Sequence, residues 1–166
     1  DLQELAQTPV TVISAGPKAI LDLPKTLQVL ETLGVPVVTF GQDELPAFWS
    51  RSSGLRSPIR MNSAEEIARS QLIREALSIP GGQLVANPIP AYAEIPFQEI
   101  LPIIKKAHLE ANKENISDKN LTPFLLEKIF NLTDGASLNA NIELVKNNAS
   151  LASKVASSLI TEKSRL

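Results

Sequence analysis

The residue best placed to do chemistry is a lysine that follows the first predicted strand. Residues 10–14 are rich in β-branched side chains, which predicts a buried parallel strand. Gly16 and Pro17 end this run, and Lys18 comes next. Open α/β sheets bind their ligands beyond the carboxyl ends of the strands, so Lys18 lies where such a sheet places its ligand chemistry. Position alone favours a simpler interpretation, a solvated loop lysine, because lysine side chains are mostly exposed.

Three asparagines and the single histidine are the other candidates. Asn87 follows a predicted strand at residues 83–86, although the neighbouring prolines fit a plain exit from the sheet just as well. Asn141 and Asn148 lie seven residues apart, on nearly the same face of the last predicted helix. Their spacing favours an exposed polar face, whereas a packed face would require hydrogen-bond partners, of which a polar ligand could be one. His108 fits a partly exposed helix residue better than a general base.

A long segment without periodicity, residues 41–60, separates two predicted elements and holds the only tryptophan. Loops of this length inside a compact domain are often functional. The alternative is an ordinary connection in which Phe48 and Trp49 anchor the loop to the core. Both interpretations fit the sequence.

Strands and helices alternate around these candidates. A helix at residues 24–33, between strands at 10–14 and 35–40, gives the strand–helix–strand unit of a parallel sheet. The pattern then predicts helices at 63–78 and 96–114, the first of which starts with a capping box. Thr122 is the expected N-cap of the next helix, with Pro123 at its first position. Ser137 is the expected cap of a last helix that runs to about Ile160.

Composition narrows the function classes. The 166 residues fit one domain of the α/β class, with a net charge of −2 and no basic block. Aromatic residues make up only 4% of the chain, so nucleic-acid binding has little support. No apolar run has the length of a membrane span. The absence of cysteine excludes disulfides and thiolate metal sites, and one histidine excludes a histidine metal cluster within one chain.

Five separated motifs resemble, in order, those of the pseudouridine-5′-phosphate glycosidase family, also called indigoidine synthase A-like. The motifs are SAGPKAILDLPKTLQVLETLGVPVV, LPAFWSRSSG, LVANPIP, TPFLLEKI and SLNANIELVKNNA. The resemblance covers about residues 1–156 and implies a three-layer α/β/α domain with a mixed, largely parallel sheet, assembled as a homotrimer. The chain opens at Asp1 without an initiator methionine, so we expect residues 1–166 to be the C-terminal portion of this domain.

The resemblance also implies an activity and its residues. Enzymes of this family cleave pseudouridine 5′-phosphate to uracil and ribose 5-phosphate, and are grouped with carbon–oxygen lyases by convention. By resemblance Lys18 is the nucleophile, whereas Asp1 and Asn141 contact the substrate. The family's proton-donating glutamate, a second lysine, a glycine-rich segment and the aspartate that holds Mn²⁺ all precede the point where this chain starts.

The implied reaction explains the need for a lysine. Uracil leaves through carbon, for which the two-carboxylate chemistry of ordinary glycosidases is poorly suited. An amine that adds to C1′ of a ring-opened ribose can expel uracil while an acid protonates C5. Such an amine must be neutral part of the time, which requires desolvation or nearby positive charge.

Other functions stay open at the level of sequence. A lysine after a strand also suits a different Schiff-base lyase acting on sugar phosphates, and the lack of the upstream residues fits a catalytically silent assembly module. The sequence leaves open whether the other half is cleaved off, disordered or on another chain. The last three residues, Ser164, Arg165 and Leu166, resemble the Ser-Lys-Leu signal and predict a peroxisomal location, with a chance match in a cytoplasmic protein as the alternative.

Overall fold

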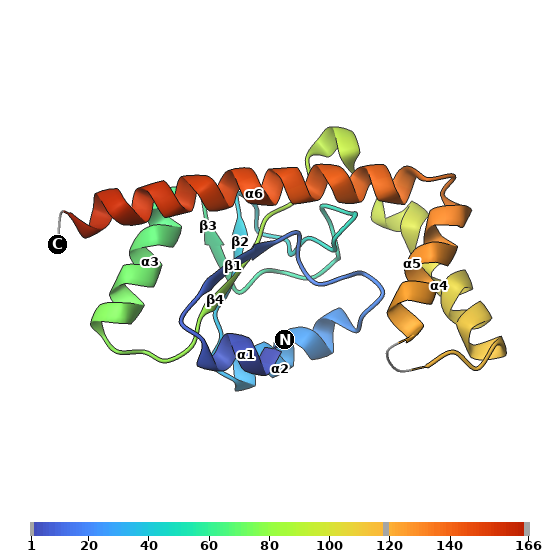
Figure 1. The fold of residues 1–166 in the computed structure, drawn as a ribbon, viewed down its shortest axis with the longest axis horizontal. Helices are drawn as coiled ribbons and strands as arrows, with labels where there is room; N and C mark the ends of the chain where they lie inside the picture. Colours follow the sequence, from blue (N-terminus) through green and yellow to red (C-terminus); the bar gives the residue numbers. More distant parts are fainter. Residues whose placement is uncertain (1, 118–119, 165–166) are drawn as a thin grey trace.

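A four-stranded parallel sheet forms the centre of the computed structural model, which describes residues 2–117 and 120–164. Its strands are β1 (Thr11–Ser14), β2 (Val37–Phe40), β3 (Ile59–Met61) and β4 (Gln83–Ala86). They are ordered β1-β4-β2-β3, and all three pairings are parallel. The predicted strands on either side of the first long helix are therefore parallel but not neighbours, because β4 lies between them (Figure 1).

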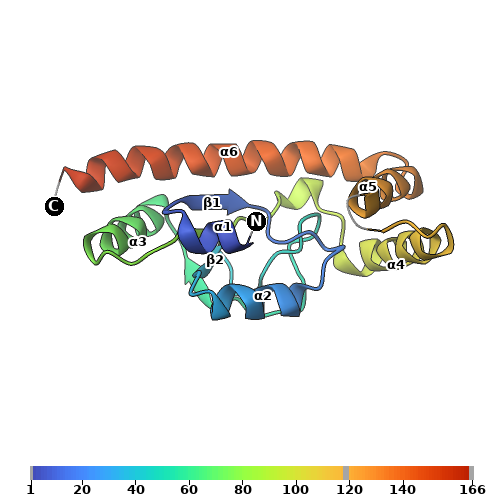
Figure 2. The ribbon, with the colours of Figure 1, turned by 60° about the horizontal axis from the view of Figure 1, so that its bottom comes forward.

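Alternate strand residues pack against helices on opposite faces of the sheet. On one face, Val38 and Val85 join a buried cluster with α3 (Ala64–Ala76) and α6 (Ala136–Lys163). On the other face, Val37 and Leu84 pack with α1 (Leu2–Gln7) and α2 (Leu23–Thr32). Figure 2 shows α6 and α2 on opposite sides of the strands. This arrangement confirms the predicted three layers and the parallel character of the sheet.

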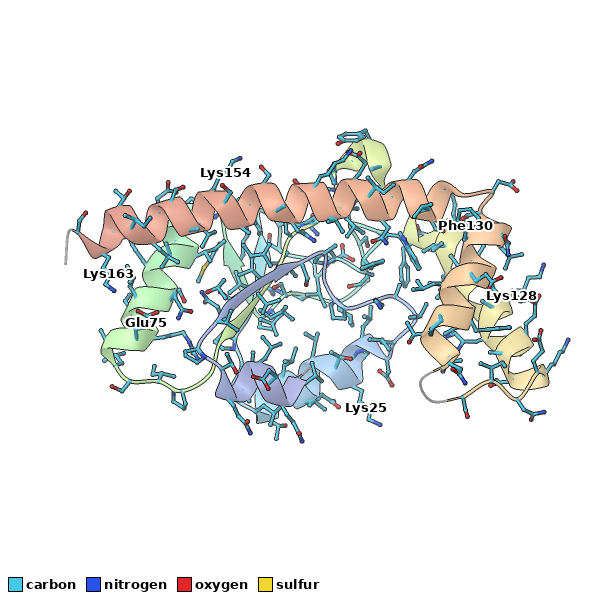
Figure 3. All side chains as sticks on the ribbon, in the orientation of Figure 1. Lys25, Glu75, Lys128, Phe130, Lys154 and Lys163 are labelled. Carbon is cyan, nitrogen blue, oxygen red and sulfur yellow. The ribbon has the colours of Figure 1, made fainter. Side chains whose placement is uncertain are left out.

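A third cluster lies beyond the carboxyl ends of the strands and builds the end of the molecule that carries Lys18. It joins η1 (Ala91–Ala93), α4 (Phe97–Lys113) and α5 (Leu121–Leu132) to the start of α6. Figure 1 shows α4 and α5 side by side at this end. Lys128 of α5, labelled in Figure 3, pairs with Glu110 of α4 at 3.0 Å.

The predicted capping box at the start of α3 forms with one difference. The Ser63 hydroxyl accepts from the Glu66 N–H at 3.2 Å, as expected. The Glu66 carboxylate, however, accepts from the Asn62 N–H at 2.6 Å rather than from that of Ser63. Two side-chain hydrogen bonds still cap the start of α3, so its predicted position is confirmed.

Two predicted helix caps are wrong. Helix α5 begins at Leu121 after Asn120, which places Thr122 inside the first turn and Pro123 at the third helical position, two positions later than predicted. A proline is tolerated there because the first N–H groups of a helix have no partner within it.

Helix α6 begins at Ala136, so Ser137 is not its cap. Gly135 precedes it with φ 83°, a left-handed conformation that turns the chain directly into the helix. The Ser137 N–H donates to the Thr133 hydroxyl at 3.2 Å. At its other end α6 runs to Lys163, three residues beyond the predicted end.

The segment predicted to be irregular up to Arg60 contains the start of β3. Val38 and Thr39 of β2 pair with Ile59 and Arg60, which gives the sheet its second edge. Three residues are too few to show a period, so tertiary pairing forms this strand without a local signal. Among the described residues, no helix is both long and apolar enough to cross a bilayer.

Candidate active site

The loop that carries Lys18 folds tightly against the segment after β2. Gly16 has φ +85°, and a Cβ built there would lie 2.2 Å from the Pro46 carbonyl oxygen. Only glycine therefore fits at this position, because it adopts the left-handed conformation readily and has no Cβ to clash with Pro46. The Phe48 N–H donates to the Ala15 carbonyl at 3.0 Å and joins the two loops. Lys18 is held two residues beyond a rigid junction at the carboxyl end of β1.

Two further hydrogen bonds order the backbone around Lys18. Its own carbonyl accepts from the Leu21 N–H at 2.9 Å, which closes a turn. The Ile20 carbonyl oxygen lies 3.2 Å from Nε2 of His108 on α4. The Lys18 side chain is half-buried, and none of the described residues forms a hydrogen bond or ion pair with its amine. The fold thus orders the loop while leaving the amine available to a ligand.

Phe48 and Trp49 anchor the segment after β2 to the body of the protein. Their rings meet edge to face with centroids 5.0 Å apart, and the buried Trp49 indole N–H donates to the Ser137 carbonyl at 3.1 Å. Phe48 holds φ 62°, which a bulky residue rarely adopts. Such strain persists only where the surroundings fix it, and it concentrates at functional sites. The anchoring interpretation is correct, and the anchored loop borders the Lys18 loop.

A carboxylate organises the rest of this segment. The Glu44 side chain accepts from the Ser52 hydroxyl at 2.5 Å, from the Ser53 N–H at 3.0 Å and from the Gly54 N–H at 2.5 Å. These donors favour the charged form, with Ser52 contributing most, and lower the pKa of Glu44 despite the opposing effect of burial. Arg51 extends from the same segment to the Ile89 carbonyl, at 2.8 Å.

The asparagines tie α6 to the carboxyl edge of the sheet. The Asn87 main-chain N–H donates to the Ser14 carbonyl at 2.7 Å, and its side-chain amide donates to the Asn148 amide oxygen at 3.1 Å. Asn147 donates to the Pro88 carbonyl at 3.0 Å. The prediction of an exposed polar face is therefore wrong for Asn148, because this part of α6 is packed against the strand ends.

Asn141 lies nearly two turns before Asn148 on the same helix and is half-buried. No residue in the described ranges forms a hydrogen bond with its amide. Its neighbour Ala140 belongs to the buried cluster that also contains Ile20. The segments of Lys18 and Asn141 thus border one cluster, and within the described residues no hydrogen bond joins their two side chains. Asp1, the other predicted substrate contact, lies outside those residues.

Local sequence reasoning missed the contribution of His108. It is a half-buried helix residue, as predicted, but its partner Ile20 lies 88 positions away. The spacing of α4 alone could have placed His108 on its apolar face, without naming what it holds. Residues 2–117 and 120–164 contain no group of three or more His, Asp or Glu side chains that could hold a metal ion.

Comparisons with known proteins identify relatives of this chain. A protein of Paracoccus denitrificans (strain Pd 1222) named pseudouridine-5′-phosphate glycosidase is 61% identical over 161 residues, which are 97% of this chain and 53% of that protein. A protein of Jannaschia sp. (strain CCS1) with the same name is 62% identical over the same shares. The chain thus spans about half the length of these relatives.

Two solved structures share the fold. The prealnumycin C-glycosynthase AlnA, solved in complex with ribulose 5-phosphate, matches with a TM-score of 0.92 and 27% identity, over 100% of this chain and 55% of its own. An indigoidine synthase A-like protein of Thermotoga maritima matches with a TM-score of 0.85 and 36% identity, over 94% of this chain and 51% of its own. The family described as indigoidine synthase A like protein matches residues 1–158, so this chain belongs to that family.

Proposed function

We propose that this chain is the C-terminal half of an enzyme that cleaves the C-glycosidic bond of pseudouridine 5′-phosphate. The observation that carries the proposal is the available amine of Lys18, in an ordered loop at the carboxyl end of β1. The names of the relatives support the substrate, and the ribulose 5-phosphate complex of AlnA supports a sugar-phosphate ligand at this fold. Uracil and ribose 5-phosphate are the proposed products.

In the proposed reaction, the neutral amine of Lys18 forms a bond to C1′ while the C1′–O4′ bond of the ribose breaks and opens the ring. O4′ takes up a proton and becomes a hydroxyl, and the added nitrogen gives up a proton, which restores its lone pair. The nitrogen lone pair then forms a C=N bond while the bond from C1′ to uracil C5 breaks. The released electron pair goes to C5, which takes a proton from an acid outside this chain. Water adds to the resulting iminium and returns ribose 5-phosphate together with the free amine.

Asn141 has the properties of a substrate contact in this scheme. Its amide is half-buried and lacks a partner among the described residues, so a polar group of a ligand would satisfy it. By contrast, Asn148 is already bonded to Asn87 and holds the helix in place. We assign substrate binding to Asn141 and a positioning role to Asn148.

The assembly and the metal are also proposals. We propose a homotrimer, whose mass in solution would show it directly. The family's Mn²⁺ is proposed to bind in the other half of the protein, because by resemblance the aspartate that holds it precedes the point where this chain starts. The steps that we assign to Lys18 and Asn141 do not depend on that ion.

The test compares this chain with a hybrid in which it replaces the matching half of the Paracoccus denitrificans relative. The hybrid should convert pseudouridine 5′-phosphate to uracil, whereas the 166-residue chain should be inactive because it lacks the acid. Hydrolysis or cleavage of simple sugar phosphates by the hybrid, without release of uracil, would favour the alternative Schiff-base lyase. Turnover by the purified chain, free of longer forms, would contradict the assignment of the acid to the other half.

A further inference from the structure

A cavity between β3 and α3 is lined by three arginines. It has a volume of about 480 Å³ and lies on elements that the proposed reaction does not use. Arg60 lines it from β3, whereas Arg69 and Arg74 line it from α3. Met61 and Ile73 add apolar surface. The cavity thus combines cationic and apolar side chains, and its volume is in the range of small-molecule sites.

Arg74 is a buried cation without a carboxylate partner. It is 9% exposed, and within residues 2–117 and 120–164 it forms no ion pair. Its Nη2 donates to the carbonyl oxygens of Pro80 at 2.9 Å and Gly82 at 3.2 Å, in the turn between α3 and β4. Its Nε is buried without a hydrogen-bond partner. A guanidinium carries five N–H donors, so much of its bonding capacity is unused.

The unused donors of Arg74 make an anion favourable in this cavity. A buried charge is costly unless it is paired, and a guanidinium cannot lose its charge by deprotonation. The carbonyls of the turn satisfy only Nη2. Nη1 has no hydrogen bond among the described residues and, unlike Nε, is not fully covered by protein. An anion in the cavity would supply both the missing charge and an acceptor.

The other two arginines are paired but keep donors of their own. Arg69 donates from Nε to Glu162 at 2.6 Å. Arg60 donates from Nε to the Asn62 amide oxygen at 2.8 Å and from Nη1 to Asp43 at 3.2 Å. The Nη2 groups of both arginines form no hydrogen bond within the described ranges. Donors from three side chains therefore border one space.

The charge of the lining favours a phosphate over a carboxylate. Its one acidic residue, Glu66, already accepts from the Asn62 N–H at 2.6 Å, so the lining has three cations against one anion. A phosphate monoester carries close to two negative charges at pH 7 and offers three acceptor oxygens. A carboxylate carries one charge and offers two oxygens. Guanidinium groups bind phosphate oxygens through paired N–H donors.

We propose that this cavity binds a small phosphate monoester. Arg74 holds the phosphate together with Arg69 and Arg60, while Met61 and Ile73 contact the organic part of the ligand. The proposal does not depend on the reaction assigned to Lys18, because no step of that reaction uses β3 or α3.

The single methionine of the chain provides a direct test. Met61 lines the cavity, so a ¹³C label on its methyl group reports on a bound ligand. In the hybrid its signal is identified by its loss in Met61→Leu. Phenyl phosphate should shift this signal saturably, with a Kd at least about tenfold lower than that of benzoate at equal ionic strength, because only the anionic group differs. No saturable shift, or equal Kd values for the two ions, would overturn the proposal.

A pair of variants tests the site without disturbing the turn that Arg74 holds. Ile73→Glu places a negative charge in the lining at a position that is 56% exposed. Leu77→Glu is the matched control, because Leu77 is 66% exposed on the same segment but lies outside the lining. The first variant should raise the Kd for phenyl phosphate about tenfold or more, and the control less than about twofold. Equal increases would contradict a site in this cavity.

Discussion

The Nε2 atom of His108 lies 3.2 Å from the carbonyl oxygen of Ile20, two residues after Lys18. A carbonyl oxygen only accepts hydrogen bonds, so Nε2 carries the proton in this contact. His108 lies on α4, and the loop it contacts follows β1. The contact links the helical end of the molecule to the loop that carries the proposed nucleophile.

Removing that donor should impair the reaction more than substrate binding. In the hybrid, His108→Phe should lower kcat about tenfold with a smaller change in KM, because the loop no longer holds the amine in line with C1′. His108→Gln retains a donor and should recover most of kcat. Steady-state kinetics on both variants provide the check. Normal kcat in the Phe variant would show that the contact does not position Lys18.

A single Cβ at Gly16 should disrupt the junction of the two loops. Gly16→Ala adds a clash with the Pro46 carbonyl to the cost of a left-handed alanine. Gly34→Ala is the matched control, since Gly34 has φ +70° and open space around it. Urea unfolding should show a loss of about 1–2 kcal/mol for the control and a clearly larger loss for Gly16→Ala. Equal losses in the free energy of unfolding for the two variants would mean that the contact between the two loops does not stabilise the protein.

The lowered pKa of Glu44 makes its contribution to stability depend on pH. At pH values just below 4.5, the ordinary pKa of a glutamate, the Glu44 carboxylate is still charged in the folded state. In the unfolded chain the same carboxylate takes up a proton at these pH values. The stabilisation is therefore present above the unfolded pKa and is lost as the pH falls through the folded value. Thermal unfolding of Glu44→Gln should show a lower Tm than wild type at pH 7, with a difference that shrinks toward pH 3. A constant difference across this range would contradict the assignment.

The bond between Asn87 and Asn148 should appear as an energetic coupling. Asn87→Ala, Asn148→Ala and the double variant form a cycle that isolates it. We expect a coupling of about 0.5–1.5 kcal/mol from urea unfolding, the range of a neutral hydrogen bond. Additive losses would indicate that the two amides do not depend on each other.

Sequence patterns within a few residues predicted those elements whose formation depends mainly on interactions between neighbouring residues. The β-branched run before Gly16 predicted β1, and the Ser63 cap predicted the start of α3. Signals of equal strength failed at Ser137, because the left-handed Gly135 starts α6 earlier and Thr133 supplies the side-chain bond. Strand β3 lacked any local signal, since only its pairing with β2 makes it a strand.

The candidate site also has parts that the sequence could predict and parts that depend on contacts between distant residues. The place of Lys18 after a strand could be predicted, because chain order determines it. The contacts that hold the Lys18 loop in place could not be predicted. They join this loop to His108 and to the loop of Pro46, which are far apart from it in the sequence. Asn141 and Asn148 have similar spacing signals but different surroundings, which only the packing of α6 against the strand ends distinguishes.

The central claim is a covalent bond between Lys18 and the sugar. Borohydride added to the hybrid during turnover of pseudouridine 5′-phosphate should reduce the iminium and leave the mass of a ribose phosphate on the peptide that contains Lys18. Lys18→Arg keeps the positive charge but cannot supply a neutral amine, so it should show neither adduct nor uracil release. An active hybrid that carries the adduct on another peptide, or an Arg variant with near-normal turnover, would contradict the account.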